Sequence, residues 1–169
     1  MTPTGLTGAE FLAVALNNGQ LPVAGGDLGI YSGGDIASAT QQGLQSEWQP
    51  RVGESTAAGG NSISAFFGAV PTHWGVAFER FADGVGALGG GNVDIRARGN
   101  IDKLTVAIPT TGRAVSGVQA QGGVFQPGVE QIEITGGGQL TMDVDGDVTG
   151  GTIHLGDGTA AIRVGGDSG

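Results

Sequence analysis

The amino-acid sequence predicts an all-β fold wound as a parallel β-helix, and three observations predict it. Glycine occupies 36 of the 169 positions, about three times its usual share of roughly 7%. Short apolar alternations recur along the chain, and no helix-length periodic segment separates them after residue 89. A twelve-residue pattern that begins with Gly-Gly occurs three times without gaps. Parallel strands this close together require a solenoid, in which each strand pairs with its equivalent in the next rung.

The repeated pattern is Gly-Gly, a polar residue, an apolar alternation and a second glycine beside Asp or Asn. It occurs as GGDLGIYSGGDI, GGNVDIRARGNI and GGQLTMDVDGDV, at residues 25–36, 90–101 and 137–148. Residues two apart share one face of a strand, so the apolar residues should point inward. We expect Leu28, Ile30, Val93, Ile95, Leu140, Met142 and Val144 to be buried, and Asp94, Arg96, Asp143 and Asp145 to be exposed. The second glycine supplies a corner, where the neighbouring Asp or Asn can bond its own backbone.

Four further segments are candidate strands of the same coil. They are LTVAI, VEQIEI, GTIHL and AAIRV, which begin at residues 104, 129, 151 and 160. An antiparallel sandwich or barrel is the alternative fold, and it would need more two-residue hairpin turns. Asp157-Gly158, between the last two segments, is one such turn.

Composition divides the chain into four parts. Residues 1–24 form a short helix and a lead-in, because Thr7 and Glu10 make a capping box before an apolar helical spacing. Residues 25–42 form the first rung, residues 43–88 an irregular insert that carries most of the aromatic residues, and residues 89–169 the remaining rungs. We interpret the insert as a small core of its own or a flap that covers the side of the coil.

Charge and composition exclude several classes of partner and cofactor. Sixteen acidic and seven basic residues give a net charge of −9, which repels phosphate backbones, so we expect no nucleic-acid partner. The chain has no cysteine, which excludes disulfides, thiol catalysis and sulfur-ligated metals. The apolar stretch near the N-terminus has no basic residue before it, so it does not have the pattern of a signal peptide.

The acidic residues near the third repeat do not form a convincing metal or catalytic motif. Asp143, Asp145 and Asp147 begin like a calcium-binding EF-hand loop. Val148 occupies the position that requires glycine, and His154 stands where the motif needs glutamate, so at most weak calcium binding remains. His154 alternates with Ile153 and Leu155, which predicts an outward-facing surface residue. We therefore expect no catalytic residues, no metal and no cofactor.

Trp48 and Trp74 in the insert are weak candidates for ligand binding. Exposed indole rings stack on sugars, so a carbohydrate-stacking platform is one interpretation of these residues. The alternative is that they build the core of the insert.

The glycine-bounded rungs, SEWQPRVG and the stretch HWGVAFERF to PTTGR together resemble the filamentous haemagglutinin-like exoproteins of two-partner secretion systems. The resemblance covers residues 20–169. It implies a right-handed parallel β-helix, a secreted or cell-surface location at the bacterial outer membrane, and export by an outer-membrane transporter that acts through other parts of a longer parent chain. The Asn-Pro motifs of the family's secretion domain do not occur here, which implies an internal or distal module.

Three functions follow as expectations. The first is a structural or adhesive segment, not an enzyme, that extends or presents surfaces for adhesion to a glycan or protein of a host or neighbouring cell. The second is a carbohydrate-active β-helix lyase or hydrolase, and the third is a lectin-like glycan-binding module that uses the insert. Because a terminal rung exposes an unpaired strand edge, we also expect end-to-end self-association.

Overall fold

The computed structural model describes residues 19–22, 24–40, 43–52, 73–121 and 124–165. Strands dominate this part of the chain, so the all-β prediction is confirmed. Its helical elements are single turns, the α-helix α2 (Gln45–Trp48) and the 3-10 helix η1 (Phe78–Arg80). The helix expected over residues 7–16 lies outside the described residues.

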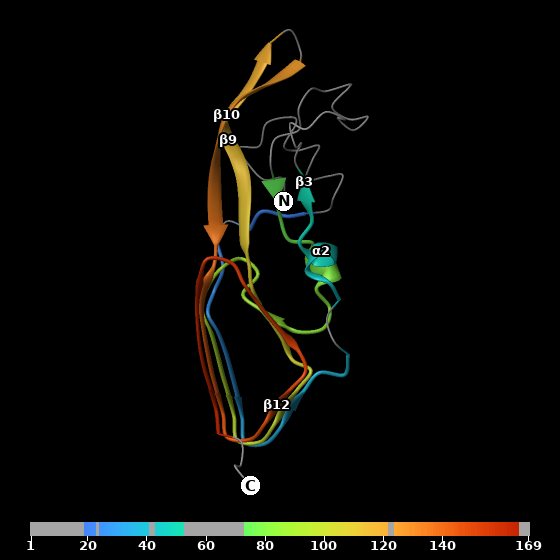
Figure 1. Ribbon diagram of the computed structural model, residues 1–169, viewed down its shortest axis with the longest axis vertical. Coiled ribbons are helices and arrows are strands. Elements are labelled where there is room, and N and C mark those ends of the chain that lie inside the picture. The colour runs from blue at the N-terminus through green and yellow to red at the C-terminus, as the bar shows by residue number, and fades with distance from the viewer. Residues whose placement is uncertain (1–18, 23, 41–42, 53–72, 122–123, 166–169) are drawn as a thin grey trace.

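Three parallel sheets form the body of the molecule, and strands far apart in the sequence lie side by side in each (Figure 1). The first has the order β1 (Leu28–Ser32), β6 (Val93–Ala97), β11 (Gly138–Val144) and β14 (Gly158–Val164). The second has the order β12 (Val148–Thr149), β7 (Ile101–Asp102) and β2 (Ile36–Ala37). The third has the order β13 (Thr152–Leu155), β8 (Thr105–Ile108) and β5 (Val85–Gly86).

The register between these strands matches the gapless alignment of the three repeats. Val93 lies beside Leu28 on one side and beside Leu140 on the other. Ile101 in the second sheet lies in the same way between Ile36 and Val148. Each repeat therefore places its equivalent residues next to those of its neighbours, as the sequence predicted.

A fourth repeat, which the sequence alignment missed, completes the first sheet. β14 pairs with β11 and places Ala160 beside Leu140 and Ile162 beside Met142. Asp157 stands where the other repeats have their first glycine, and equivalent residues here are only 20 positions apart. The shorter spacing and the lost glycine explain why the segment was recognised as a strand and not as a repeat.

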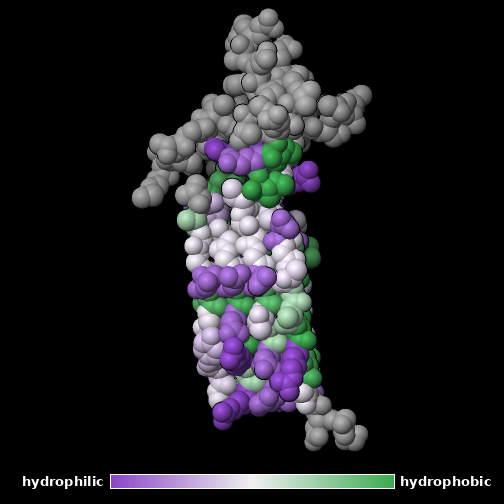
Figure 2. Space-filling model, turned by 90° about the vertical axis from the view of Figure 1, so that its left-hand side faces the viewer, coloured by the Kyte–Doolittle hydropathy of each residue, from purple (hydrophilic) through white to green (hydrophobic). Residues whose placement is uncertain are grey.

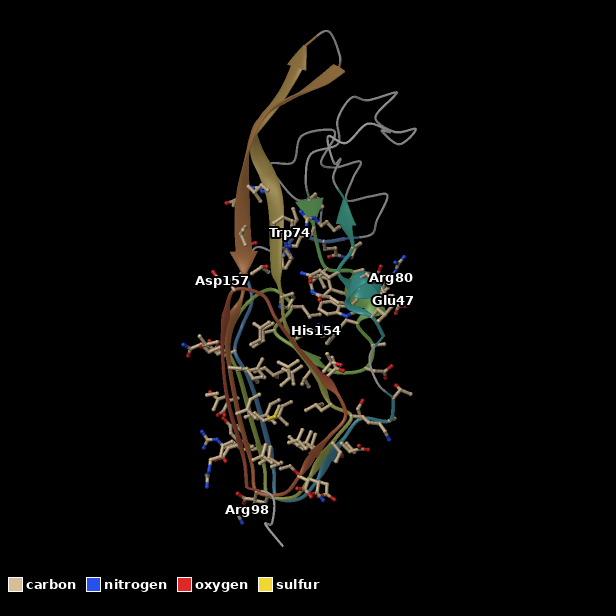
Figure 3. All side chains as sticks on the ribbon, in the orientation of Figure 1. Glu47, Trp74, Arg80, Arg98, His154 and Asp157 are labelled. Atoms are coloured by element: carbon tan, nitrogen blue, oxygen red, sulfur yellow. The ribbon has the colours of Figure 1, made fainter. Side chains whose placement is uncertain are left out.

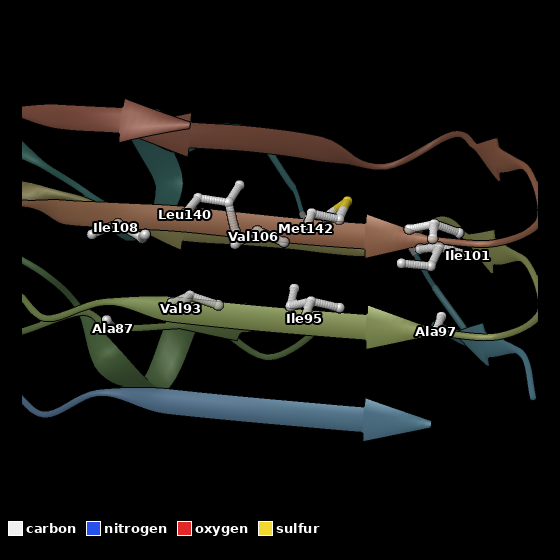
Figure 4. Close-up of a cluster of buried hydrophobic side chains, with 10 residues drawn as sticks. Ala87, Val93, Ile95, Ala97, Ile101, Val106, Ile108, Leu140 and Met142 are labelled. Carbon is white, nitrogen blue, oxygen red and sulfur yellow. The ribbon is translucent and has the colours of Figure 1, made fainter. Parts of the chain in front are cut away.

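The inward apolar residues of the central repeats form the core (Figure 4). Its buried members are Ala87, Val93, Ile95, Ala97, Ile101, Val106, Ile108, Leu140, Met142 and Val144. Leu28 and Ile30 are only partly buried, which corrects the prediction for them, because β1 is an edge strand with a neighbour on one side only. The four residues that were expected to be exposed also differ in burial. Arg96 and Asp145 are exposed, whereas Asp94 and Asp143 are half-buried, which corrects the prediction for these two.

Side chains on the outer face of the first sheet pair across and along its strands. The Tyr31 hydroxyl donates to Asp94 at 2.8 Å, and Arg163 forms an ion pair with Asp143 at 3.2 Å. Residues of similar hydropathy form horizontal rows on this face (Figure 2), as expected where equivalent positions lie side by side. Exposed pairs of this kind contribute only about 0–1 kcal/mol each, so they are not the main source of the register.

In the first two repeats the polar residue of each corner bonds the backbone of the following repeat, whereas the sequence suggested a bond to its own backbone. Asp27 Oδ1 accepts the Asn92 backbone N–H at 2.7 Å, and Asn92 Oδ1 accepts that of Gln139 at 3.0 Å. The other corner repeats this arrangement: Asp35 Oδ1 accepts from Asn100 at 2.7 Å, and Asn100 Oδ1 accepts from Asp147 at 2.8 Å. Two hydrogen-bond ladders thus run from repeat to repeat and align them.

A fourth, antiparallel sheet leaves the body between β8 and β11. Its order is β10 (Val124–Gly136), β9 (Thr110–Gln121), β4 (His73–Trp74) and β3 (Arg51–Val52). β9 and β10 form a long hairpin that projects beyond the parallel sheets (Figure 1). The candidate strand at residues 129–134 lies in β10 and pairs antiparallel with β9, so its assignment to a parallel sheet is wrong. The hairpin closes at its base, where the Gly137 N–H donates to the Pro109 carbonyl at 3.0 Å.

The turn at Asp157-Gly158 does not close an antiparallel hairpin. β13 before it pairs with β8, and β14 after it pairs with β11, both in parallel. The turn is therefore a corner between two parallel sheets. The main feature that favoured the antiparallel alternative thus belongs to the parallel part of the fold.

The insert of residues 43–88 contributes both a strand and a cover to the body. Its β5 belongs to the third parallel sheet, which places the end of the irregular segment before residue 85 rather than at 88. Trp48 and Val76 pack on Ala107 in a second buried cluster, with Phe81 and Leu88 against it. Ala107 lies in β8, so this part of the insert covers one face of the third sheet, in agreement with the flap interpretation.

Truncation of the central core side chain should be costly. Ile95 is fully buried between Ile30 and Met142. We expect Ile95→Ala to lower the free energy of unfolding by about 2–5 kcal/mol, because it removes apolar contacts and leaves a cavity. Urea unfolding measures this, with Thr141→Ala on the exposed side of β11 as the control. A loss below about 0.5 kcal/mol for Ile95→Ala would contradict its place in the core.

Close packing between repeats should make one corner glycine indispensable. Gly91 has a φ of +126°, and a Cβ there would lie 2.5 Å from the Gly26 carbonyl oxygen. We expect Gly91→Ala to destabilise the fold by more than the roughly 1 kcal/mol of a simple conformational change. Gly33→Ala is the matched control, because a Cβ at Gly33 meets no atom within 4 Å. Equal urea midpoints for the two variants would disprove the close approach.

Candidate functional site

A pocket of about 350 Å³ lies where α2 meets the edge of the antiparallel sheet. Its lining residues are Gln45, Ser46, Gln49, Arg51 and Trp74. Gln45 and Gln49 are four residues apart, which puts them on one side of the helical turn. Trp48 is buried on the other side, against the third parallel sheet. Trp48 thus anchors the amphipathic turn on the sheet, and its polar side chains line the pocket.

Trp74 also lines the pocket, and its position depends on a glycine. Its indole N–H donates to the Thr110 carbonyl at 3.0 Å. Gly112 is its cross-strand neighbour on β9, and a Cβ there would lie 2.3 Å from the indole ring. Only glycine at this position therefore lets the ring lie flat against the sheet. Figure 3 shows Trp74 at the base of the projecting hairpin.

The glutamine side chains tie α2 to the same carbonyl. The Gln49 amide N–H donates to the Thr110 carbonyl at 2.6 Å, and the Gln45 amide N–H donates to Gln49 Oε1 at 2.5 Å. The Thr110 oxygen thus accepts from both Gln49 and Trp74. These bonds fix the relative positions of the helical turn and the sheet, so the polar wall of the pocket is preorganised.

Arg51 supplies a positive charge to the lining of the pocket. It is the cross-strand neighbour of Trp74, and its guanidinium carbon lies 5.6 Å from the indole centroid. The ion pairs found in the described residues are Arg96–Asp94, Lys103–Asp102, Arg113–Glu133 and Arg163–Asp143. In this part of the chain no carboxylate forms an ion pair with Arg51. A guanidinium is a group that can bind an anion through paired N–H bonds.

Trp48, the other sequence candidate, is not available to a ligand. Its side chain has no exposed surface and packs edge-on against Phe81 and His154, with ring centroids 5.1 and 5.5 Å away. It belongs to the buried cluster in which the insert packs on the third sheet, so its role is in the core and not in ligand binding. Only Trp74 of the pair lines the pocket. Gln45, Ser46, Gln49 and Arg51 were not predicted as binding residues: the last three lie in SEWQPRVG, which supports the family resemblance but carries no ligand-binding pattern of its own.

His154 faces outward from its sheet, as predicted, but it does not lie on the open surface. It is the neighbour of Ala107 in the third sheet, and Trp48 packs on it. Burial of the imidazole lowers the pKa of His154 below its usual value of 6.5. The covering insert, which the sequence could not place, accounts for this difference.

The acidic residues of the third repeat lie apart from the pocket and do not converge. Asp143 forms an ion pair with Arg163, and Asp145 and Asp147 are exposed near the following corner. Within the described residues no three histidine, aspartate or glutamate side chains gather closely enough to hold a metal ion. The same part of the chain contains no helix long and apolar enough to span a membrane.

Comparisons of the chain with protein families, with curated proteins and with solved structures give no match.

Protonation of His154 should weaken the fold. Because its pKa is lower in the folded protein than in the unfolded chain, the unfolded chain takes up the proton more readily as the pH falls below about 6.5. The free energy of unfolding should therefore fall more steeply between pH 7.5 and 5.5 in the wild type than in His154→Gln. Urea unfolding at several pH values tests this, and the carboxylates contribute equally to both proteins. Identical pH slopes would show that His154 is not buried.

Proposed function

We propose that the chain is a structural segment of a secreted bacterial surface protein, in which the parallel sheets are the faces of a right-handed parallel β-helix. The observation that carries this proposal is the unbroken register of the repeats, in which equivalent residues lie side by side in successive strands. The resemblance to filamentous haemagglutinin-like exoproteins supports the handedness and the surface location.

The order in which the chain visits the sheets supports a coil. β6, β7 and β8 lie in the first, second and third sheets, and β11, β12 and β13 follow the same order before β14 returns to the first. Each circuit advances by one strand spacing, about 4.8 Å. Added circuits would lengthen the body while one continuous apolar core fills its interior, so the proposed role is to hold binding surfaces away from the cell.

The partners in this proposal are a glycan or protein on a host or neighbouring cell, and an outer-membrane transporter that acts on other parts of a longer parent chain. The parent reading frame should then encode a secretion domain, with a transporter gene beside it. A parent that lacks both would contradict this part of the proposal.

The enzymatic alternative has less support. A glycoside hydrolase needs two carboxyl groups on opposite sides of a bound sugar, about 5–9 Å apart. Asp143 is engaged by Arg163, Asp145 is exposed, and neither lines the pocket. The pocket itself is lined by amides, a hydroxyl, an arginine and an indole, which can bind a ligand but offer no carboxyl pair.

The strand edge at β14 should make isolated chains associate end to end. All seven residues of β14 are exposed, and Ile162 and Val164 leave about half of their surface in solvent. The edge strand β1 of a second copy offers the same half-buried apolar positions and can continue the register. The net charge of −9 opposes association. We expect light scattering to show growing oligomers as salt is raised to about 0.5 M, where the Debye length is a few ångströms.

A matched pair of variants makes this test specific. Ile162→Lys places a charge on the inward side of β14, whereas Ala161→Lys adds the same charge on the outward side. Ile162→Lys should abolish the association, and Ala161→Lys should largely retain it. A wild type that stays monomeric at every salt concentration, with β14 protected in hydrogen exchange, would overturn the proposal.

A further inference from the structure

We propose that the pocket between α2 and the antiparallel sheet binds an acidic sugar unit of a glycan through its carboxylate. This inference does not depend on the β-helix proposal, because it rests on the side chains of the pocket alone. It identifies a ligand class for a surface that the proposed body would present.

Arg51 is the group that recognises the carboxylate. A guanidinium is planar and can donate two parallel N–H bonds to the two oxygens of a carboxylate. The indole of Trp74 lies 5.6 Å from the guanidinium carbon, which holds the cation by a cation–π contact and restricts its orientation. The ion pairs found among the described residues do not include Arg51.

The rest of the lining fits a hydroxyl-rich ligand. Gln45 uses one amide N–H on Gln49, which leaves its carbonyl oxygen and second N–H as partners for ligand hydroxyls. Ser46 adds a hydroxyl that can both donate and accept. Sugar hydroxyls need donors and acceptors of this kind close together, and amide side chains supply both.

The size of the pocket suits one or two sugar units. Its volume of about 350 Å³ is at the small end of the roughly 300–1,000 Å³ typical of small-ligand sites. The lining residues carry two amides, a hydroxyl, a guanidinium and an indole, which match the hydroxyls and the carboxylate of an acidic sugar. We therefore favour a saccharide over an acidic peptide, which would pair along a strand edge.

The opposite charges of the site and of the whole chain give the binding a clear signature. The net charge of −9 repels free anions in solution. An anionic ligand is therefore attracted only when it contacts the guanidinium of Arg51 directly. Higher salt should reduce this repulsion while it weakens the direct contact less, since a contact pair is less screened than distant charges.

Titration of the full chain with single sugars tests the proposal. Glucuronate, glucose, glucose 6-sulfate and, as a peptide analogue, N-acetylglutamate amide are each added up to about 10 mM, which covers the range of weak single-site binding by ligand-observed NMR. We expect saturable binding of glucuronate, at least tenfold weaker binding of glucose, and at least tenfold loss of glucuronate affinity in Arg51→Gln. Arg98→Gln removes the same charge at the lower end of the parallel sheets, away from Trp74 (Figure 3), and should leave the affinity unchanged.

Four patterns of binding would overturn the proposal. They are equal binding of glucose and glucuronate, tighter binding of the sulfate, equal loss in the two arginine variants, and preference for N-acetylglutamate amide over glucuronate, which would indicate a peptide ligand. Absence of saturable binding also overturns it. Unfolding midpoints for both variants show whether Arg51→Gln is folded, and Arg51→Lys, which keeps the charge but loses the two-pronged geometry, should bind at an intermediate affinity. None of these outcomes bears on the light-scattering test of end-to-end association.

Discussion

Hydrogen bonding from one repeat to the backbone of the next is the constraint on which the rest of the structure depends. Asp27, Asn92, Asp35 and Asn100 each place a side-chain oxygen on a backbone N–H of the following repeat. These bonds sit at both ends of the first sheet's strands, so they fix the strands lengthwise. A slip of one residue would break all four and turn the apolar side chains outward. Apolar burial alone fixes which face is inward, whereas the ladders fix the position along the strand.

The pocket inherits its geometry from this alignment. Trp48 anchors α2 on Ala107 and beside His154, which come from neighbouring strands of the third sheet. That sheet also continues through Pro109 into β9, whose Thr110 carbonyl holds Gln49 and Trp74. Contacts with the same stack of strands therefore hold both walls of the pocket in position.

The sequence allowed the repeats to be predicted because their signals are local. Alternation of Val93 and Ile95 and the glycine corners follow from the geometry of a single strand and its turn. The antiparallel pairing of β10 could not be read, because an alternating strand looks the same whichever direction its partner runs. β5 was missed since two residues, Val85 and Gly86, carry no period. The burial of Trp48 depends on a sheet formed mostly by residues far along the chain, and no spacing within the insert reveals it. The pocket could not be predicted for the same reason, because its lining residues are brought together by contacts between distant parts of the chain.

The distance in sequence between equivalent positions changes from 65 to 47 to 20 residues, while the alignment of the strands does not change. The additional residues between equivalent strands leave the parallel sheets at fixed positions and form the covering insert and the projecting hairpin. A longer excursion between fixed anchor points costs little entropy, about 0.6 kcal/mol for each doubling of its length. Scaffold and appendage can therefore evolve separately. Mutations that lengthen, shorten or replace an appendage change the surface that the molecule displays and leave the parallel sheets beneath it intact. Such a chain can therefore diversify its outer surface while its fold stays the same.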